Sequence, residues 1–196
     1  MLLIQGCPTM GYYNDANSVK EYIEMVRGYD GRFLIEILRN HLKPEATVLE
    51  IGMGPGKDLD ILNQTYRTTG SDNSQIFLNL YKNRNPAADI LFLDARILQT
   101  KRKFDCIYSN KVLHHLSRDE LKKSFQRQID VLNPNGIVFH SFWKGKKEEE
   151  YHGLRFMYYT AEELMRIIGD GFEPIDVNSY TEMEEQDSLY VILKKK

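Results

Sequence analysis

The chain has 196 residues, a usual length for one domain, and hydrophobic residues make up 42% of it, which is enough for a sizeable core. Its 26 basic and 28 acidic side chains give a formal net charge of −2, which argues against a dedicated nucleic-acid-binding protein. The two cysteines, Cys7 and Cys106, are too few for a disulfide framework, so we expect a cytoplasmic setting.

The first part of the chain is expected to form a helical arm. Residues 1–8 lack a basic leader and carry too short an apolar stretch for a signal peptide, and no window reaches the length of a membrane span, so no membrane association is expected. Over residues 19–42 apolar side chains recur at helical spacing, with a break near Gly28. We predict an arm or lid over residues 1–42, packed on a domain over residues 43–196.

The rest of the chain alternates short β-rich runs with helical patterns. The predicted strands cover residues 47–51, 67–71, 90–93, 104–109, 137–139, 174–180 and 188–193. The predicted helices cover residues 58–66, 74–82, 118–132 and 161–168, the last two with capping boxes that begin at Ser117 and Thr160. Residues 144–150 are expected to form a solvated loop that could gate the pocket.

This alternation predicts an α/β fold. We expect a Rossmann-like, doubly wound, seven-stranded and mostly parallel sheet, with helices on both faces and an antiparallel C-terminal strand. The third and fourth strands are nearly continuous in apolar residues, which is typical of strands that are covered on both faces. In such sheets ligands bind beyond the carboxyl ends of the strands.

A glycine-rich run directly follows the first predicted strand. From Glu50 the chain reads EIGMGPG, which places glycines at Gly52, Gly54 and Gly56. Glycines at alternate positions let the backbone approach a ligand closely, and the next helix would point its free N–H groups into the same space. We therefore expect a ligand at this turn, although a tight turn without a ligand would use the same glycines.

The spacing of these glycines disfavours a dinucleotide. The dinucleotide-binding pattern is Gly-x-Gly-x-x-Gly, so its third glycine would fall at position 57 or 59. Those positions hold Lys57 and Leu59.

An acidic residue closes each of the first three predicted strands. Glu50 lies two residues before the first glycine, Asp72 lies 72 − 52 = 20 residues after it, and Asp94 follows the third strand. A carboxylate at the end of an apolar strand needs a partner, which a ligand ammonium group or the loop itself would supply. An acid placed like Asp72 commonly binds ribose hydroxyls, and Asp94 could accept from an exocyclic amine of adenine.

These features together resemble the class I S-adenosylmethionine-dependent methyltransferases. The run Glu-x-Gly-x-Gly-x-Gly is similar to their main motif, and residues 104–116, which include SNKVLHHL, are similar to the motif after their fourth strand. Small-molecule methyltransferases of the ubiquinone-biosynthesis type carry a comparable Val-Leu-His-His-Leu sequence. The resemblance extends from about residue 42 to the C-terminus.

The resemblance implies S-adenosylmethionine as the cofactor. The residues expected to bind it are Glu50, Gly52, Met53, Gly54, Gly56, Asp72, Asn73, Asp94, Ala95 and Asn110. Within this set, Asp72 and Asn73 would hold the ribose, Asp94 and Ala95 would contact adenine, and the glycine loop and Asn110 would approach the methionine part.

The sequence contains no comparable motif for the binding site of the methyl acceptor. A general base is needed only if the acceptor must lose a proton, and His115 and His114 are the candidates because imidazole titrates near neutral pH. Alternatively, one histidine caps the next helix or bonds a backbone carbonyl while the other is exposed. The aromatic side chains expected in the acceptor pocket are Tyr12, Tyr13, Tyr29 and Trp143, although Trp143 could belong to the core instead.

We therefore expect an enzyme that transfers a methyl group from S-adenosylmethionine to a small-molecule acceptor. It would act as a monomer or homodimer without a metal, because His114, His115 and His140 do not form a zinc-binding spacing. No nucleic-acid partner is expected. Two alternatives stay open: a methyltransferase acting on protein or nucleic acid, and a non-catalytic S-adenosylmethionine-binding partner subunit.

Overall fold

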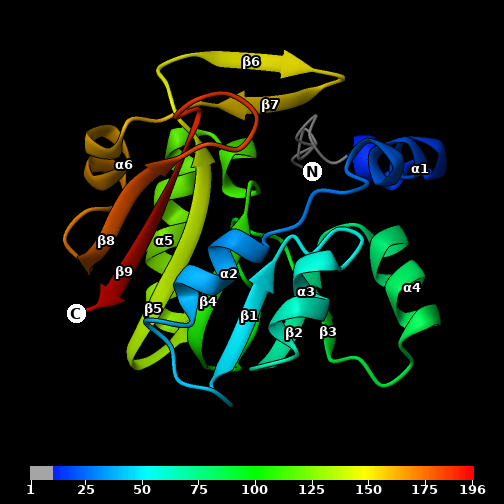
Figure 1. Cartoon of the computed structure of the whole chain (residues 1–196), viewed down its shortest axis with the longest axis horizontal. Coiled ribbons are helices and arrows are strands. Elements are labelled where there is room, and N and C mark those ends of the chain that lie inside the picture. Colours follow the sequence, from blue (N-terminus) through cyan, green and yellow to red (C-terminus); the bar gives the residue numbers. More distant parts are fainter. Residues whose placement is uncertain (1–10) are drawn as a thin grey trace, which may run out of the picture.

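A computed structural model describes residues 11–196, so Cys7 and the first ten residues of the predicted arm lie outside the described residues. The described chain is built on a seven-stranded sheet with the strand order β3-β2-β1-β4-β5-β9-β8 (Figure 1). Its strands are β1 (Thr47–Ile51), β2 (Arg67–Asp72), β3 (Ile90–Phe92), β4 (Phe104–Asn110), β5 (Leu132–Trp143), β8 (Phe172–Tyr180) and β9 (Ser188–Lys195). A separate two-stranded hairpin consists of β6 (Glu148–Tyr151) and β7 (Leu154–Met157).

The pairing of the strands confirms the predicted fold class. Strands β1 to β5 run parallel, and β9 runs antiparallel between β5 and β8. The order reverses between β1 and β4, and this reversal point is where doubly wound sheets bind their ligands.

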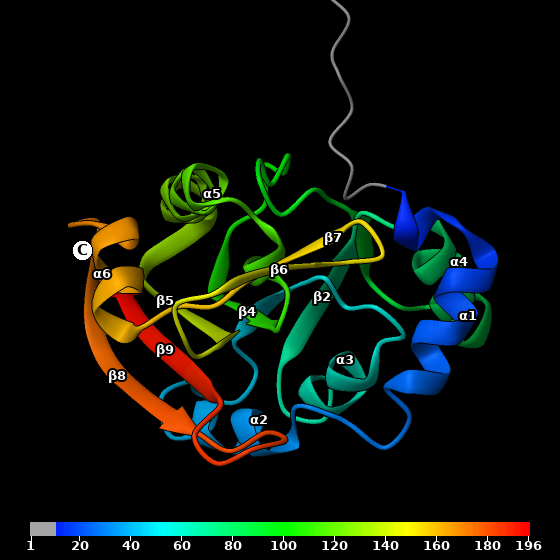
Figure 2. The ribbon, with the colours of Figure 1, turned by 90° about the horizontal axis from the view of Figure 1, so that it is seen from above.

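Helices lie on both faces of the sheet (Figures 1 and 2). They are α1 (Ala16–Met25), α2 (Arg32–Leu38), α3 (Lys57–Leu62), α4 (Gln75–Arg84), α5 (Arg118–Val131) and α6 (Ala161–Ile168), with short 3-10 turns η2 (Tyr12–Asn14) and η3 (Leu113–His115). Apolar side chains of α5 and α6 form one core cluster with one face of the sheet, and those of α2 and α3 form another with the opposite face. The side chains of α2 that lie in this core are Leu34, Ile35 and Leu38.

The helix starts follow from local capping chemistry. The Ser117 hydroxyl accepts from the Glu120 backbone N–H, and the Glu120 side chain accepts from the Ser117 backbone, so the predicted capping box of α5 is confirmed. At α6 only half of the predicted box forms. Thr160 Oγ1 accepts from Glu163 N at 3.2 Å, but the Glu163 carboxylate pairs with Arg118 at 2.7 Å instead.

Two local predictions are wrong. Strand β3 is not covered on both faces, because it lies at the edge of the sheet and Phe92 is 58% exposed. The segment predicted as a loop over residues 144–150 contains β6, because Glu148 to Tyr151 pair with Leu154 to Met157 across a tight turn at His152 and Gly153.

Two elements cover the carboxyl edge of the parallel strands. Figure 2, which looks down on that edge, shows the β6–β7 hairpin crossing over the sheet toward α1. Asp15 caps α1 by accepting from Ser18 N, and the backbone carbonyl of Tyr13 accepts from the Ser74 hydroxyl at the start of α4. The amino-terminal segment is thereby tied to the edge where the site is expected.

Candidate functional site

Two neighbouring cavities open beyond the carboxyl ends of β1, β2 and β4. The first has a volume of about 130 Å³ and the second about 340 Å³. Residues that line both cavities are Tyr13, Tyr22, Gly52, Gly54, Asn110, Lys111, His115 and Leu154. The cavities therefore share the glycine loop as one wall, so a ligand held in the first could reach a ligand in the second.

The glycine loop presents bare backbone to this space at Gly54. A Cβ atom at Gly54 would meet nothing nearer than Tyr22 Cε1 at 3.8 Å, and the residue has a positive φ of 49°. Gly56 has a different role, because its Cβ would lie 2.3 Å from the Tyr81 ring and the residue lines neither cavity. The structure thus brings Gly52, Met53 and Gly54 to the site, whereas Gly56 allows α3 to begin close to α4.

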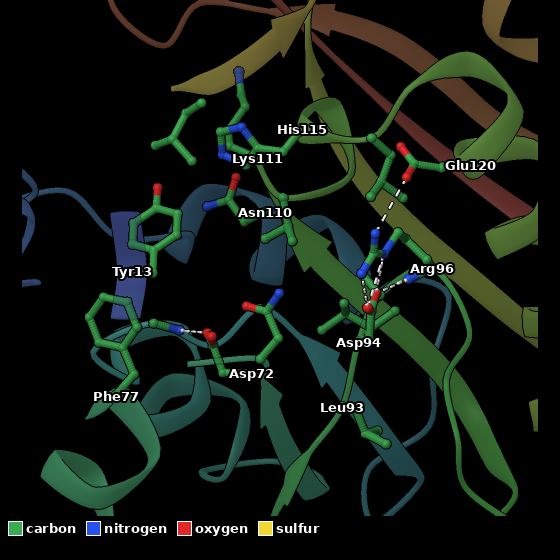
Figure 3. Close-up of a pocket in the computed structure, with 18 of the residues that line it drawn as sticks. Tyr13, Asp72, Phe77, Leu93, Asp94, Arg96, Asn110, Lys111, His115 and Glu120 are labelled. Atoms are coloured by element: carbon green, nitrogen blue, oxygen red, sulfur yellow. Dashed lines mark hydrogen bonds and ion pairs between the residues drawn. The ribbon is translucent and has the colours of Figure 1, made fainter. Parts of the chain in front are cut away.

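Asp72 connects the glycine loop to the next turn of the sheet edge. Its Oδ2 accepts from the Gly54 backbone N–H at 2.9 Å (Figure 3). Its Oδ1 accepts from the Ser74 backbone N–H at 2.8 Å. Burial raises the pKa of Asp72 to about 6, against the lowering effect of these hydrogen bonds. Each carboxylate oxygen retains a second lone pair for a ligand hydroxyl.

Glu50 is a buried carboxyl group that lacks a full set of partners. It is 4% exposed, and its Oε2 has no hydrogen-bond partner within residues 11–196. Burial, with Asp58 and Asp72 nearby, raises the pKa of Glu50 well above its usual range. A buried acceptor of this kind is unfavourable by about 1–3 kcal/mol, so a ligand that brings a cationic N–H donor would relieve it.

Asp94 lies across the first cavity from Asp72, beside Ala95 (Figure 3). The Arg96 guanidinium donates to both oxygens of Asp94, with Nε 2.9 Å from each, and also reaches Glu120 at 3.5 Å (Figure 3). Although burial raises it, the hydrogen bonds from Arg96 keep the pKa of Asp94 below its usual value. A ligand amine at this wall would therefore share an ionised carboxylate with Arg96, and the adenine contact stays a prediction.

Asn110 is oriented by partners that the sequence did not reveal. The Ser141 hydroxyl donates to Asn110 Oδ1 at 2.6 Å, and Asn110 Nδ2 donates to Asp58 Oδ2 at 3.2 Å. Asp58 also accepts from the Gly31 backbone and from Tyr108, which ties the entry of α2 to α3 and β4. Asn110 thus has a fixed orientation at the junction of the two cavities.

The two candidate histidines differ in their surroundings. His115 lies within hydrogen-bond distance of a backbone carbonyl, with Nδ1 2.6 Å from Arg155 O, so Nδ1 must carry the proton and Nε2 a lone pair when the ring is neutral. Burial lowers the pKa of His115, which favours that neutral form. His114 is 2% exposed, neither of its ring nitrogens has a partner within the described chain, and its ring stacks on Phe156. The carbonyl contact considered as an alternative for one histidine is present, but the other is buried rather than exposed.

The four aromatic residues predicted for the acceptor pocket all line the second cavity, and their contact with an acceptor stays a prediction. The same wall contains aromatic residues that sequence reasoning missed, namely Tyr22, Tyr151 and Phe156. Tyr22 was visible only as part of a helical apolar pattern. Tyr151 and Phe156 belong to the hairpin, which lies mostly beyond the loop predicted over residues 144–150.

Lys111 is a further residue that the sequence reasoning did not single out. Its ammonium nitrogen lies 3.5 Å from the centre of the Trp143 ring and 2.5 Å from Ser188 Oγ. Burial lowers the pKa of Lys111 to about 8, although Glu182 at 3.9 Å acts against this. It directly follows Asn110 after β4, a position where a residue can reach both cavities.

The described residues hold no group of three or more His, Cys, Asp and Glu side chains that could bind a metal ion. Within residues 11–196, no helix has the length and apolar character needed to cross a bilayer.

The fold and this site define a class of proteins. Among solved structures, 1,6-didemethyltoxoflavin-N1-methyltransferase from Burkholderia thailandensis, with 1,6-didemethyltoxoflavin and S-adenosylhomocysteine bound, superposes with a TM-score of 0.78 at 19% identity, over 100% of this chain and 93% of that one. A TehB-like S-adenosylmethionine-dependent methyltransferase from Corynebacterium glutamicum gives a TM-score of 0.75 at 17% identity, over 93% and 100% of the two chains. The architecture is therefore the class I methyltransferase fold.

The sequence comparisons point to the same class of proteins. Residues 48–136 match the family described as "Methyltransferase domain". This match and the shared fold are both similarities to methyltransferases, and the fold is that of S-adenosylmethionine-dependent members. The ubiquinone-biosynthesis branch stays a prediction.

Two curated relatives match this chain over only part of their own lengths. They are tRNA (carboxymethyluridine(34)-5-O)-methyltransferase of Arabidopsis thaliana, 27% identical over 128 residues, and phosphoethanolamine N-methyltransferase of Plasmodium falciparum, 28% identical over 141 residues. The alignments cover 64% and 65% of this chain but only 31% and 53% of those proteins. The chain thus spans about a third and about half of the lengths of these relatives.

The raised pKa of Asp72 predicts a pH dependence of ligand binding. If ribose hydroxyls donate to the ionised carboxylate, S-adenosylhomocysteine should bind with a constant affinity above pH 7 and lose affinity as pH falls through about 6. We expect binding about tenfold weaker at pH 5 than at pH 7, measured by calorimetry.

The substitution Asp72→Asn is the control for this pH profile, and it should flatten the profile between pH 5 and 7. The stability of the ligand-free protein changes with pH in the opposite direction to its affinity for the ligand. A folded-state pKa of about 6, above the ordinary 3.8, means that the ligand-free protein loses stability as pH rises through that window. A binding profile that is equally steep in Asp72→Asn would assign the titration to another group.

Proposed function

We propose that this chain binds the adenosyl part of S-adenosylmethionine in the first cavity, with the methionine part passing the shared glycines toward Glu50, and transfers the methyl group to a small-molecule acceptor in the second cavity. The observation that carries the proposal is the glycine loop, because Gly54 lies in the wall that the two cavities share and leaves open space there, while Glu50, with its unpartnered carboxyl oxygen, lines the second cavity. When bound, S-adenosylmethionine supplies a methyl group that is already activated on a sulfonium, so the protein mainly provides alignment and exclusion of water.

The residues present fit this cofactor. Glu50, Asp58 and Asp72 are buried carboxyl groups around the glycine loop, and they favour a ligand with a positive charge. Asp72, which lines the first cavity with Asn73 and Ala95, would accept from the ribose hydroxyls. Glu50, which lines the second cavity, would accept from the ammonium group. The N–H of Gly54 holds Asp72 in place, so one hydrogen bond fixes both the loop and the carboxylate.

The second cavity suits an organic acceptor. Its aromatic walls exclude water from the reacting atoms and give a flat or apolar molecule large contact areas. Asn110, Lys111 and His115 supply polar groups at the end that adjoins the first cavity. The attacking atom of the acceptor would therefore lie at that polar end.

His115 is proposed as the group that removes the acceptor's proton. Its Nδ1–H is bound to the Arg155 carbonyl, which orients the ring and leaves the Nε2 lone pair as the acceptor for a proton. Because burial lowers its pKa, the ring is in the basic form at neutral pH. The proton of an attacking N–H or O–H group would pass to Nε2 as the methyl group is transferred.

This role predicts that His115→Ala lowers turnover by about 10²- to 10⁴-fold, the usual contribution of a general base. S-adenosylhomocysteine affinity should change by less than about threefold, because the ring would act on the acceptor. Turnover is measured with an acceptor found by a screen of metabolites for consumption of methyl-labelled cofactor.

The matched control is His41→Ala, because His41 follows α2 and lines neither cavity. It should leave turnover unchanged. Full activity of His115→Ala would reduce His115 to a structural residue.

An RNA acceptor is the second candidate, because one relative is a tRNA methyltransferase. The second cavity, however, balances Lys57 and Lys111 with the acids Asp30 and Glu182, so it lacks the excess of basic side chains that binding of a phosphate backbone needs. The same labelled-cofactor screen distinguishes the candidates when it includes total RNA and a protein extract. Incorporation into RNA or protein alone would overturn the small-molecule acceptor, and binding of cofactor without any transfer would favour a non-catalytic subunit.

A further inference from the structure

The second cavity has an unusual order of polarity from its inner end to its mouth. The inner end, where it adjoins the first cavity, contains the polar side chains of Asn110, Lys111 and His115 next to Tyr13, Tyr22 and Leu154. The mouth carries four large apolar side chains that remain in contact with solvent, together with the exposed Asp30. Ligand sites and interfaces normally have the reverse order, with an apolar centre and a polar rim.

Four side chains make up this apolar mouth, and we call them the rim: Met25, Tyr29, Tyr151 and Met183. They are 63%, 50%, 62% and 64% exposed, and all four line the second cavity. Among the described residues, nine large hydrophobic side chains are 42% exposed or more, so nearly half of these surround one opening. Single exposed apolar residues are ordinary, but a group of them around one cavity marks a binding surface.

The rim comes from four separate segments of the chain. Met25 ends α1, Tyr29 lies between α1 and α2, Tyr151 ends β6, and Met183 lies in the connection from β8 to β9. Figure 2 shows the hairpin crossing over the sheet edge, with α1 and the β8–β9 connection at other sides of the same edge. No single amphipathic helix or strand accounts for the group, so its members share only their position at the opening.

We propose that the acceptor is an amphipathic molecule, whose polar head enters the second cavity and whose apolar tail lies across the rim. This inference rests on the proposed function, since it takes the inner end of the cavity as the place of methyl transfer. The polar inner end and the apolar mouth match a head and a tail in that order. The tail would cover the rim side chains, which are otherwise left in water, and would therefore add to affinity.

Charge argues for a molecule of this kind over a membrane or a nucleic acid as the occupant of the rim. Each rim residue has an acidic neighbour in the chain: Glu24, Asp30, Glu150, and Glu182 with Glu184. Asp30 and Glu182 themselves line the second cavity. Three of these carboxylates have a basic partner, Arg27, Arg32 or Lys111, so the rim has no excess of basic side chains that would attract a surface carrying phosphates. An uncharged tail needs no such attraction.

The length of the tail provides the test. Full burial of one methylene group is worth about 0.8 kcal/mol, or about fourfold in affinity, and a tail that is half covered would gain about twofold per methylene. The probes are 4-butylphenol and 4-octylphenol, titrated by calorimetry into protein saturated with S-adenosylhomocysteine. Fluorescence of Trp143, the one tryptophan of the chain, reports whether they occupy the second cavity. We expect the octyl compound to bind more than tenfold more tightly than the butyl compound and to alter that fluorescence.

Two double variants assign the gain to the rim. Met25→Ser with Met183→Ser should reduce the octyl-to-butyl affinity ratio to below threefold. Leu80→Ser with Ile175→Ser is the matched control, because these side chains are 42% and 44% exposed and line neither cavity. The control should keep the full ratio, and both variants should bind S-adenosylhomocysteine as the parent chain does.

Several results would overturn the proposal. They are a ratio below threefold in the parent chain, an unchanged ratio in the rim variant, and no binding of the octyl compound in the second cavity. A dimer in sedimentation velocity that dissociates in the rim variant would assign the rim to a second copy of the chain. Flotation with phosphatidylcholine vesicles that the rim variant loses would assign it to a membrane. Failure of the proposed function is distinct, because S-adenosylhomocysteine itself would then not bind.

Discussion

Replacing Asp72 with alanine should weaken binding of S-adenosylhomocysteine by about 100-fold. Its carboxylate accepts hydrogen bonds from the backbone N–H groups of Gly54 and Ser74. The substitution therefore removes the proposed ribose contacts and also the hydrogen bond that fixes the glycine loop. Hydrogen bonds to a charged group contribute about 1.5–3 kcal/mol each, and loss of about 2.7 kcal/mol corresponds to this factor. Calorimetric titration of the folded variant measures the change.

Asp89→Ala is the matched control for this experiment. Asp89 pairs with Arg102 and accepts from Thr69 before β3, and it lines neither cavity. It should leave the affinity for S-adenosylhomocysteine within about twofold of the parent value. An unchanged affinity in a folded Asp72→Ala variant would remove Asp72 from the cofactor site.

Gly54→Val should abolish detectable binding of S-adenosylhomocysteine while the chain still folds. The space beside Gly54 is open in the protein, with Tyr22 Cε1 at 3.8 Å as the nearest atom to a built Cβ, so a valine side chain would project into the cavity rather than clash with the core. We expect affinity to fall by more than 100-fold. Circular dichroism and thermal unfolding verify the fold, and equilibrium dialysis with labelled ligand measures binding.

Backbone strain has to be separated from the filling of the cavity. Valine at the positive φ of Gly54, 49°, is strained by about 1–3 kcal/mol wherever its side chain points. Gly169→Val is the control, because Gly169 ends α6 with a φ of 73° and a built Cβ there has nothing within 4 Å. It should lower the melting temperature in the same way but keep normal binding. Normal binding by Gly54→Val would exclude the glycine loop from the cofactor site.

The fold could be predicted from the sequence because its signals are local. The alternation of apolar strands and helical patterns, the Ser117 capping box and the missing helix between the last two strands specify the order and direction of the elements. The position of a strand within the sheet is not a local property. An apolar run such as the one that ends at Phe92 reads alike at a sheet edge and at its centre, so the exposure of β3 could not be predicted.

The cofactor side of the site was predictable for the same reason. Glu50, the glycine loop and Asp72 follow the ends of consecutive strands, and parallel strands bring those ends to one edge. Gly56 shows the limit of this reasoning. Its place in the motif suggested a ligand contact, but its distance to the Tyr81 ring depends on how α4 packs against α3.

The acceptor side depends on contacts between distant segments. Lys111 reaches Trp143 and Ser188, and His115 contacts the Arg155 carbonyl of the hairpin, over separations that no motif records. The hairpin itself escaped prediction because Glu148 to Glu150 are exposed and charged, which is typical of a loop as well as of a strand outside the core. The rim, which combines four segments, could only be seen once they were folded together.

The central claim is that bare backbone at Gly54, flanked by Glu50 and Asp72, forms the binding site for an adenosyl sulfonium. The most direct measurement is a crystal structure of the chain grown with S-adenosylhomocysteine. We predict the adenosyl part of the ligand in the first cavity, with its ribose hydroxyls on the Asp72 carboxylate, and its amino group past the shared glycines, toward Glu50. A ligand bound elsewhere, or a first cavity that stays empty at saturating ligand, would contradict it.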